Sequence, residues 1–182
     1  MPRWLRSAQT RARRTPRGWK MHLLSCSLDL TTHQGRYISE GARSLTEAGL
    51  GNSSAKLLPA GAVLVSSRAP IGLVAIAAVP LTTNQGIRSL VLDETQDATF
   101  WYYLLRQSTS LLDAHANGST FREISGGSLA KLTFTVPSLE WQRRLALTLS
   151  RLDELIEHNL EINTALATLS QLGAQYAVRL SK

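Results

Sequence analysis

The period of the hydrophobic and polar positions changes once along this chain, at Pro137. Before that residue, short β-prone runs lie at Ala62 to Ser66, Leu73 to Val79 and Ile87 to Leu92. Turn signals that contain Pro and Gly separate the runs, as at residues 69–72. Short strands at this spacing predict a compact, curved β-sheet unit.

One amphipathic helix follows the predicted strands. Asp97 is a suitable N-cap, because its side-chain oxygen can accept a hydrogen bond from the first helical turn. The positions that follow at helical spacing are Phe100, Tyr103, Leu104, Gln107, Leu111 and Leu112. The pattern predicts a helix over roughly 98–114, packed on the sheet. Residues 132–136 then alternate between apolar and polar, which predicts a half-buried final strand with Lys131 on its polar face.

The chain after Pro137 has the pattern of one long helix. Ser138 can cap it, and no proline follows. Apolar residues continue at helical spacing to Tyr176, and Gly173 is a point where the helix can break or end. A helix over 138–172 is about 52 Å long, which is too long for a small domain to bury, so it needs a partner helix. The residues predicted to pair are Leu149, Leu152, Ile156, Asn159, Asn163 and Leu166.

Two asparagines, Asn159 and Asn163, lie four residues apart in this apolar stripe. A buried Asn in a helix seam lowers stability but selects the register and the number of partners. In the alternative interpretation, both side chains face solvent.

The formal net charge of +7 belongs to one end of the chain. Residues 1–20 carry seven Lys and Arg and no acid, and the other 13 Lys and Arg are balanced by 13 Asp and Glu. A basic segment of this kind can bind phosphates weakly, or it is a solvated, disordered leader. We interpret residues 1–35 as a basic leader that is disordered or unrelated to the rest.

The sequence contains no evident catalytic or metal-binding constellation. It has no Gly-rich phosphate loop, its four histidines lack ligand spacing, and its acids do not cluster as a metal-dependent nuclease requires. No apolar run approaches the ~18 residues that span a bilayer. The single cysteine, Cys26, fits a reducing cytosol. These features predict a cytoplasmic, non-enzymatic protein with no cofactor, no metal and no membrane contact.

Four segments, taken in order, resemble signatures of the specificity subunits of type I restriction–modification systems. The segment VPSLEWQ at 136–142 is similar to the family's strand-to-helix junction. The segments LVSSRAPIG at 64–72 and TNQGI at 83–87 are similar to its strand-turn and to its second signature. The segment GSTFREI at 118–124 is similar to the loop after its recognition-domain helix. The resemblance covers roughly residues 36–172.

The resemblance implies a non-catalytic, DNA-reading subunit with an α+β fold. A compact, β-rich target-recognition domain at 36–136 is followed by a long coiled-coil-type helix at 137–182. Full-length members carry two such domains, each reading half of a split DNA site, and two helices that pair antiparallel. The implied partners are double-stranded DNA, the methyltransferase (M) subunits, which methylate adenine, and the restriction/translocase (R) subunit. With one domain and one helix, this chain resembles a half-length form, expected to pair as a homodimer or with another half-subunit, or to shelter its stripe against M subunits.

The turns and loops of these signatures supply the candidate DNA contacts. They are Ser66, Ser67, Arg68, Asn84, Gln85, Ser119, Thr120, Arg122 and Lys131. Arginine can contact guanine bidentately, Asn or Gln can pair with adenine, and cations can contact phosphates. Structural roles stay open for the same residues. Arg68 can form a salt bridge at a sheet edge, Asn84 and Gln85 can close a turn, and Lys131 can simply be solvated.

Two other functions fit the sequence. The neutral body favours a helical assembly module that docks other proteins without specific DNA binding, because DNA binders usually present a basic face. The third interpretation is a detached or decayed recognition-domain fragment, since residues 1–35 do not match the sheet that opens the family's domain. The surface potential and binding to a separate catalytic subunit distinguish these interpretations.

Overall fold

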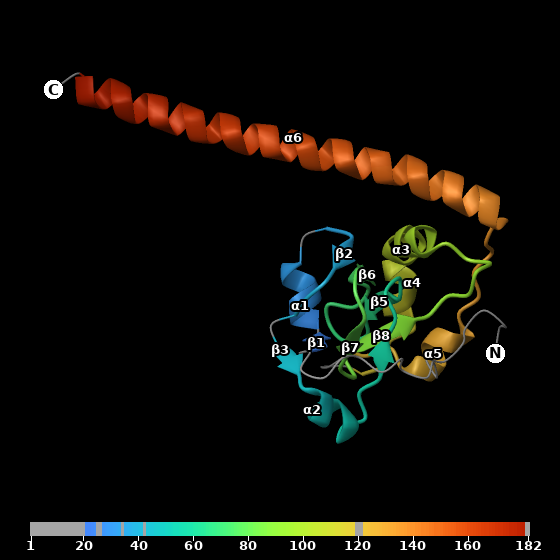
Figure 1. The fold of residues 1–182 in the computed structure, drawn as a ribbon. Helices are drawn as coiled ribbons and strands as arrows, with labels where there is room; N and C mark the ends of the chain where they lie inside the picture. The colour runs from blue at the N-terminus through green and yellow to red at the C-terminus, as the bar shows by residue number, and fades with distance from the viewer. Residues whose placement is uncertain (1–20, 25–26, 34, 42, 119–121, 181–182) are drawn as a thin grey trace. The chain divides into compact units, whose positions relative to one another are not determined.

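The chain folds into two compact units, one ending at Arg143 and the other beginning at Arg144. The residues that the computed structural model describes are 21–24, 27–33, 35–41, 43–118 and 122–180. Among these residues, the first unit holds two β-sheets with short helices around them, and the second is part of one long helix (Figure 1). The predicted α+β class is confirmed.

The first sheet has the strand order β3-β1-β7-β4. β1 pairs antiparallel with β3 and parallel with β7, and β4 pairs antiparallel with β7. The strand bounds are β1 (Met21–Leu24), β3 (Arg43–Leu45), β4 (Leu57–Leu58) and β7 (Leu81–Thr83).

The second sheet has the order β2-β6-β5-β8. β5 is antiparallel to both β6 and β8, and β2 is added parallel to β6. The strand bounds are β2 (Tyr37–Ile38), β5 (Val63–Ser66), β6 (Val74–Ala77) and β8 (Ile87–Leu90). The three strands predicted from short apolar runs are therefore confirmed as β5, β6 and β8, each slightly shorter than predicted.

The first sheet corrects the predicted boundary of the basic leader. β1 is paired on both sides, and the helix α1 (Ser27–Thr32) follows it, with Leu30 buried in the core. Residues 21–24 and 27–32 thus belong to the folded unit, although we expected the leader to run to residue 35. A four-residue strand is too short to show a period, and its partners lie far along the chain. Residues 1–20, which hold the excess charge, lie outside the described residues.

The predicted helix at 98–114 is present as two helices. α3 (Ala98–Gln107) begins at the predicted N-cap, where the Asp97 carboxylate accepts the Phe100 N–H at 2.8 Å. α4 (Thr109–Ala114) follows after a break at Ser108. The Ser108 hydroxyl donates to the Leu104 carbonyl at 2.7 Å, and such back-bonding bends helices.

The prediction of a final strand at 132–136 is wrong. These residues are extended and alternate in exposure as expected, but no ladder pairs them with the described strands. The ring of Phe134 packs edge-on against the buried Trp101 ring of α3, with centroids 5.7 Å apart. Lys131 is the last residue of α5 (Gly126–Lys131), a helix capped by the Ser125 hydroxyl. A third short helix, α2 (Glu47–Gly51), is capped by Thr46.

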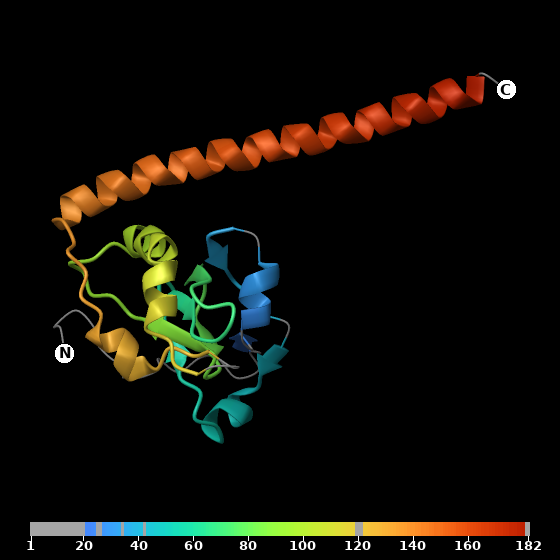
Figure 2. The same ribbon diagram turned by 180° about the vertical axis from the view of Figure 1, so that it is seen from behind.

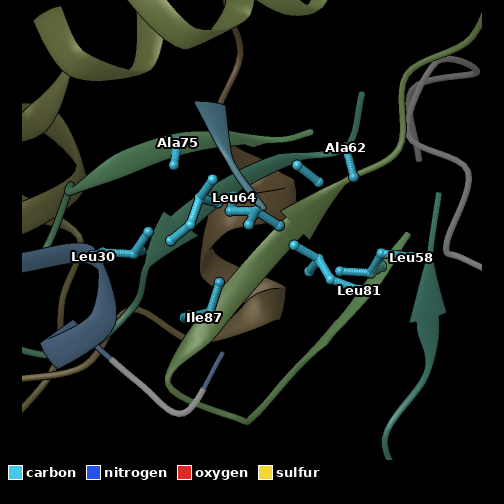
Figure 3. Close-up of a cluster of buried hydrophobic side chains, with 9 residues drawn as sticks. Leu30, Leu58, Ala62, Leu64, Ala75, Leu81 and Ile87 are labelled. Atoms are coloured by element: carbon cyan, nitrogen blue, oxygen red, sulfur yellow. The ribbon is translucent and has the colours of Figure 1, made fainter. Parts of the chain in front are cut away.

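Both faces of β5 are buried. Leu64 belongs to a cluster of nine buried apolar side chains that come from both sheets and α1 (Figure 3). Val63 and Val65 point to the opposite face, as alternation along a strand requires, and α3 packs over β5 and β6. Each fully buried Val or Leu contributes about 1.5–3 kcal/mol. α1 and α5 lie on opposite sides of the sheets (Figure 2).

The last helix, α6 (Leu139–Leu180), has 42 residues, about 63 Å at 1.5 Å per residue. It continues past Gly173, where we expected a possible end. Its residues 139–143 belong to the first unit, so that unit extends beyond the boundary predicted at 136. None of the described helices is long and apolar enough to cross a bilayer.

Candidate nucleic-acid interface

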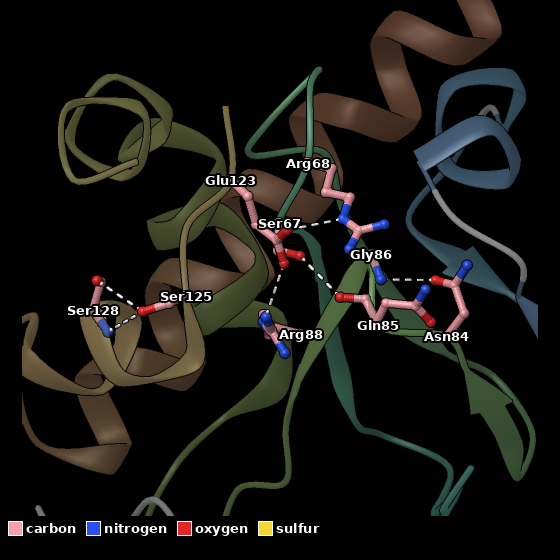
Figure 4. A network of polar contacts seen from close by, with 9 residues as sticks. All are labelled: Ser67, Arg68, Asn84, Gln85, Gly86, Arg88, Glu123, Ser125 and Ser128. Carbon is pink, nitrogen blue, oxygen red and sulfur yellow. Dashed lines mark hydrogen bonds and ion pairs between the residues drawn. The ribbon is translucent and has the colours of Figure 1, made fainter. Parts of the chain in front are cut away.

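Three of the sequence signatures meet at one edge of the second sheet (Figure 4). The Ser67 N–H donates to the Gly86 carbonyl at 2.9 Å, and the Ile124 N–H donates to the Ser67 carbonyl at 2.9 Å. Arg68 and Glu123 also form an isolated antiparallel bridge. The turn after β5, the turn before β8 and the segment before α5 are thereby held together, although they lie far apart in the sequence.

Ser66 and Ser67 are completely buried, which corrects their prediction as DNA contacts. The Ser66 hydroxyl donates to the Pro70 carbonyl at 2.6 Å and accepts the Leu73 N–H at 2.9 Å. The Ser67 hydroxyl donates to the Gln85 carbonyl at 3.3 Å. A hydroxyl with no exposed surface cannot reach a base edge, so both side chains hold the turns in shape.

Glu123 holds two arginines. Arg68 Nε donates to one carboxylate oxygen at 3.0 Å, and Arg88 Nη2 donates to the other at 3.1 Å. The alternative role considered for Arg68, a salt bridge at a sheet edge, is therefore present. Exposed ion pairs of this kind are worth only about 0–1 kcal/mol each. Because a guanidinium has five N–H donors, both arginines keep donors for a ligand, and the trio retains a positive charge.

The turn before β8 is closed by Asn84. Its side-chain oxygen accepts the Gly86 N–H at 2.9 Å, so the structural role considered for Asn84 is also present. The neighbouring Gln85 side chain is exposed. This turn therefore offers Gln85, next to Arg68 and Arg88, as an accessible amide (Figure 4).

The loop after α4 is closed at its base. Asn117 and Glu123 exchange two backbone hydrogen bonds, of 3.0 and 2.9 Å. Arg122 forms a salt bridge of 3.2 Å with Asp113, and 43% of its side chain is exposed. Ser119 and Thr120, the other predicted contacts in this loop, lie outside the described residues. Lys131 is exposed at the end of α5.

Arg88 and Glu123 are not among the contacts predicted from the sequence. Both lie within or beside the signatures at 83–87 and 118–124, so a sequence signal was available. β8 pairing sets Arg88 opposite Val65, which brings its side chain to the same edge as Arg68. That juxtaposition depends on strand register, which the sequence does not reveal.

The fourth signature forms a junction instead of a binding surface. Gln142, in the first turns of α6, is only 1% exposed. Its side-chain oxygen accepts the Asp97 N–H at 3.0 Å, and its amide donates to the Pro137 carbonyl at 2.9 Å and to the Gln96 side-chain oxygen at 3.2 Å. These bonds connect the start of α6 to the N-terminus of α3.

The predicted pairing residues of α6 follow a regular heptad spacing. From Leu149 to Leu166, they succeed one another at alternating intervals of three and four residues, which is the pattern of a coiled-coil seam. Leu152, Ile156 and Leu166 are more than half exposed, at 51%, 58% and 57%. The remaining members, Leu149, Asn159 and Asn163, are exposed as well.

Metal chemistry has no evident site in this surface. Within the described ranges, no three His, Cys, Asp or Glu side chains lie close enough together to hold a metal ion.

The chain matches a family model described as "Type I restriction modification DNA specificity domain" over residues 27–168. It is 39% identical over 144 residues to the type I restriction enzyme MjaIX specificity subunit of Methanocaldococcus jannaschii, covering 78% of this chain and 33% of that protein. It is 30% identical over 111 residues to the HindI specificity subunit of Haemophilus influenzae, covering 59% of this chain and 24% of that protein. The chain thus spans a third or less of the length of these relatives.

Solved structures show the same fold. The HsdS subunit from Thermoanaerobacter tengcongensis aligns with a TM-score of 0.53 at 18% identity, over 77% of this chain and 31% of that chain. A structure described under complex assembly and conformational transition of the type I R-M system aligns with a TM-score of 0.59 at 21% identity, over 75% of this chain and 32% of that chain. Since the family model covers most of its length, this chain belongs to the type I restriction–modification DNA specificity family.

Proposed function

We propose that this chain is a non-catalytic DNA-recognition subunit that reads one half of a bipartite site. In doing so it positions adenine methyltransferase and restriction subunits of a type I restriction–modification complex on the DNA. The observation that carries the proposal is the meeting of three family-like segments at one polar edge, around Arg68, Arg88 and Glu123. An edge built from loops on a rigid sheet is a usual place for a reading surface.

Within this proposal, the base-reading candidates are the accessible side chains of that edge: Arg68, Gln85 and Arg122. Asn84 is half-buried and uses its oxygen within the turn, so its amide nitrogen is what remains for a base. Lys131 is assigned to phosphate contact. Ser119 and Thr120 stay candidates from the sequence.

The second part of the proposal is pairing through α6. The exposed leucines and isoleucines of α6 run from Leu145 to Leu172, about 40 Å at 1.5 Å per residue. A helix with such an uncovered apolar stripe gains little stability by itself, since isolated helices depend on packing. Two copies, or this chain and another half-subunit, would cover each other's stripes. A two-fold pair would carry two identical recognition domains, so its DNA target would be a spaced palindrome.

The test is co-expression with the M subunit of the same system in a host without adenine methylation, followed by sequencing of methylated bases. We expect one bipartite motif, palindromic if the chain pairs with itself. Arg68→Ala should weaken binding to that motif by about 1–3 kcal/mol if Arg68 contacts a base, and Arg68→Lys should fail to rescue it. If Arg68 contacts a phosphate instead, Arg68→Lys should restore binding. A soluble complex that methylates no motif would refute DNA recognition.

The alternative is an assembly module without specific DNA binding. The balance of 13 cations and 13 acids outside the first 20 residues favours it. It predicts that the chain binds the M subunit and changes nothing in the sequence preference of methylation.

A further inference from the structure

A groove of about 570 Å³ opens beside the polar edge around Arg68, Arg88 and Glu123, which we call the reading edge. The proposed function gives no role to the groove itself. It lies between the segment that precedes β4 and the turn that joins β7 to β8. Its polar and charged lining residues are Ser53, Ser54, Lys56, Thr83, Asn84, Gln85, Arg88 and Ser89. The rest of the lining is apolar: Leu45, Ala55, Leu58 and Ile87.

The charge of this groove is of one sign. Among the residues that the structure describes, Lys56 and Arg88 are the only charged side chains that line it, and no Asp or Glu does. The chain outside its first 20 residues is neutral in sum, so this groove is a local excess of positive charge. Hydroxyl and amide donors surround the two cations, which is the donor set that a phosphate group requires.

The two cations have donors to spare. Lys56 is exposed and makes no ion pair with an acid among the described residues. Arg88 gives only Nη2 to Glu123, and 30% of its side chain stays exposed. Its Nε is buried, so the donors left for a ligand are those of the Nη groups. Glu123 therefore fixes the position of the Arg88 guanidinium without using up its hydrogen-bonding capacity.

The groove is continuous with the reading edge. Asn84, Gln85 and Arg88 belong to both (Figure 4). The pairing of β4 with β7 brings the chain at Lys56 beside the start of the turn at Asn84, because Leu57 lies opposite Thr82. A duplex read at this edge would therefore carry its own phosphates past the groove.

We propose that this groove binds a backbone phosphate of DNA through Lys56 and Arg88, with the Ser54 hydroxyl as a further donor. The Ser53 hydroxyl lines the groove as well, but it donates to the Leu50 carbonyl. The proposal rests on the proposed function, because it takes the phosphate to belong to the duplex that is read. The contact sets the register of the protein on the DNA and carries no sequence information.

The test measures the affinity of the full chain, in complex with its M subunit, for a duplex with the methylated motif and for a scrambled duplex. Measurements at several KCl concentrations give the salt slope. In Lys56→Gln we expect the slope to fall by about one and both duplexes to be bound about 5-fold more weakly at 0.15 M salt. Arg88→Gln should act in the same direction. Arg106→Gln, which removes a positive charge from α3 outside the groove, is the matched control and should leave the slope unchanged.

Several results would overturn the proposal. A wild-type slope in both Lys56→Gln and Arg88→Gln would remove the groove from the interface, and a loss confined to the motif duplex would mean base contact. If inorganic phosphate at constant ionic strength abolishes the difference between wild type and Lys56→Gln, the site binds free phosphate. A wild-type complex with equal affinity for both duplexes would refute the proposed function. If instead the wild-type complex prefers the motif duplex and both variants keep the wild-type salt slope, only the groove proposal is refuted.

Discussion

Gln142 connects the start of the long helix to the recognition domain, and its removal should be costly. The side chain is 1% exposed and makes three hydrogen bonds, one with the Asp97 N–H, one with the Pro137 carbonyl and one with the Gln96 side chain. Truncation to alanine removes all three hydrogen bonds at once. It also leaves polar groups at the N-terminus of α3 without a partner and opens a void.

The magnitude follows from these contacts. Each hydrogen bond contributes about 0.5–1.5 kcal/mol net, and a buried group left unsatisfied costs about 1–3 kcal/mol. We therefore expect Gln142→Ala to lower the free energy of unfolding by about 2–4 kcal/mol. The same change should lower Tm by a shift on the order of 10 °C. Gln142→Glu keeps the acceptor for Asp97 but loses the amide donor to Pro137, so it should be intermediate or, if its charge stays buried, equally damaging.

The assay is urea unfolding at fixed protein concentration, followed by tryptophan fluorescence and far-ultraviolet circular dichroism. Trp101 is buried close to the junction and reports on the first unit, whereas the dichroism is dominated by helix. Gln107→Ala, an exposed glutamine at the end of α3, is the control and should change stability by no more than about 0.5 kcal/mol. If Gln142→Ala is as stable as Gln107→Ala, the junction does not depend on these hydrogen bonds.

Three further predictions follow from other parts of the molecule. Gly72→Ala should destabilise the folded chain by about 2–4 kcal/mol in thermal unfolding, because Gly72 has a φ of +86° and a Cβ there would lie 2.6 Å from the Thr109 methyl. Gly51→Ala is the control: its Cβ meets open space, so the change should be nearly neutral. Leu152→Asp combined with Ile156→Asp should abolish pairing and leave the recognition domain folded, and a wild-type chain that sediments as a soluble monomer at tens of micromolar would contradict self-pairing. Deletion of residues 1–20 should lower non-specific DNA affinity at low salt without changing sequence preference, since seven cations without acids lie there, and a loss of preference would contradict this.

Features that depend on neighbouring residues could be predicted from the sequence. The Asp97 cap, the strands β5, β6 and β8, and the start of α6 after Pro137 are found where the sequence analysis expected them. The family could be predicted for a similar reason, because its four short signatures can each be read locally and occur in a fixed order along the chain. Each of these signals lies within a few residues of the element that it specifies.

Features that depend on contacts between distant residues could not be predicted from the sequence. The sequence pattern does not predict β1, because β1 is a strand only through its pairing with β3 and β7. The same kind of pattern predicts a strand at 132–136, although no described strand pairs with it. Ser66 and Ser67 carry polar side chains in a turn signature, yet the tertiary structure buries them. The Glu123 pairs with Arg68 and Arg88 join residues 55 and 35 positions apart. Periodicity reports the local environment of each side chain, whereas strand pairing and burial are set by the whole fold, and the composition of the reading edge is a property of that fold.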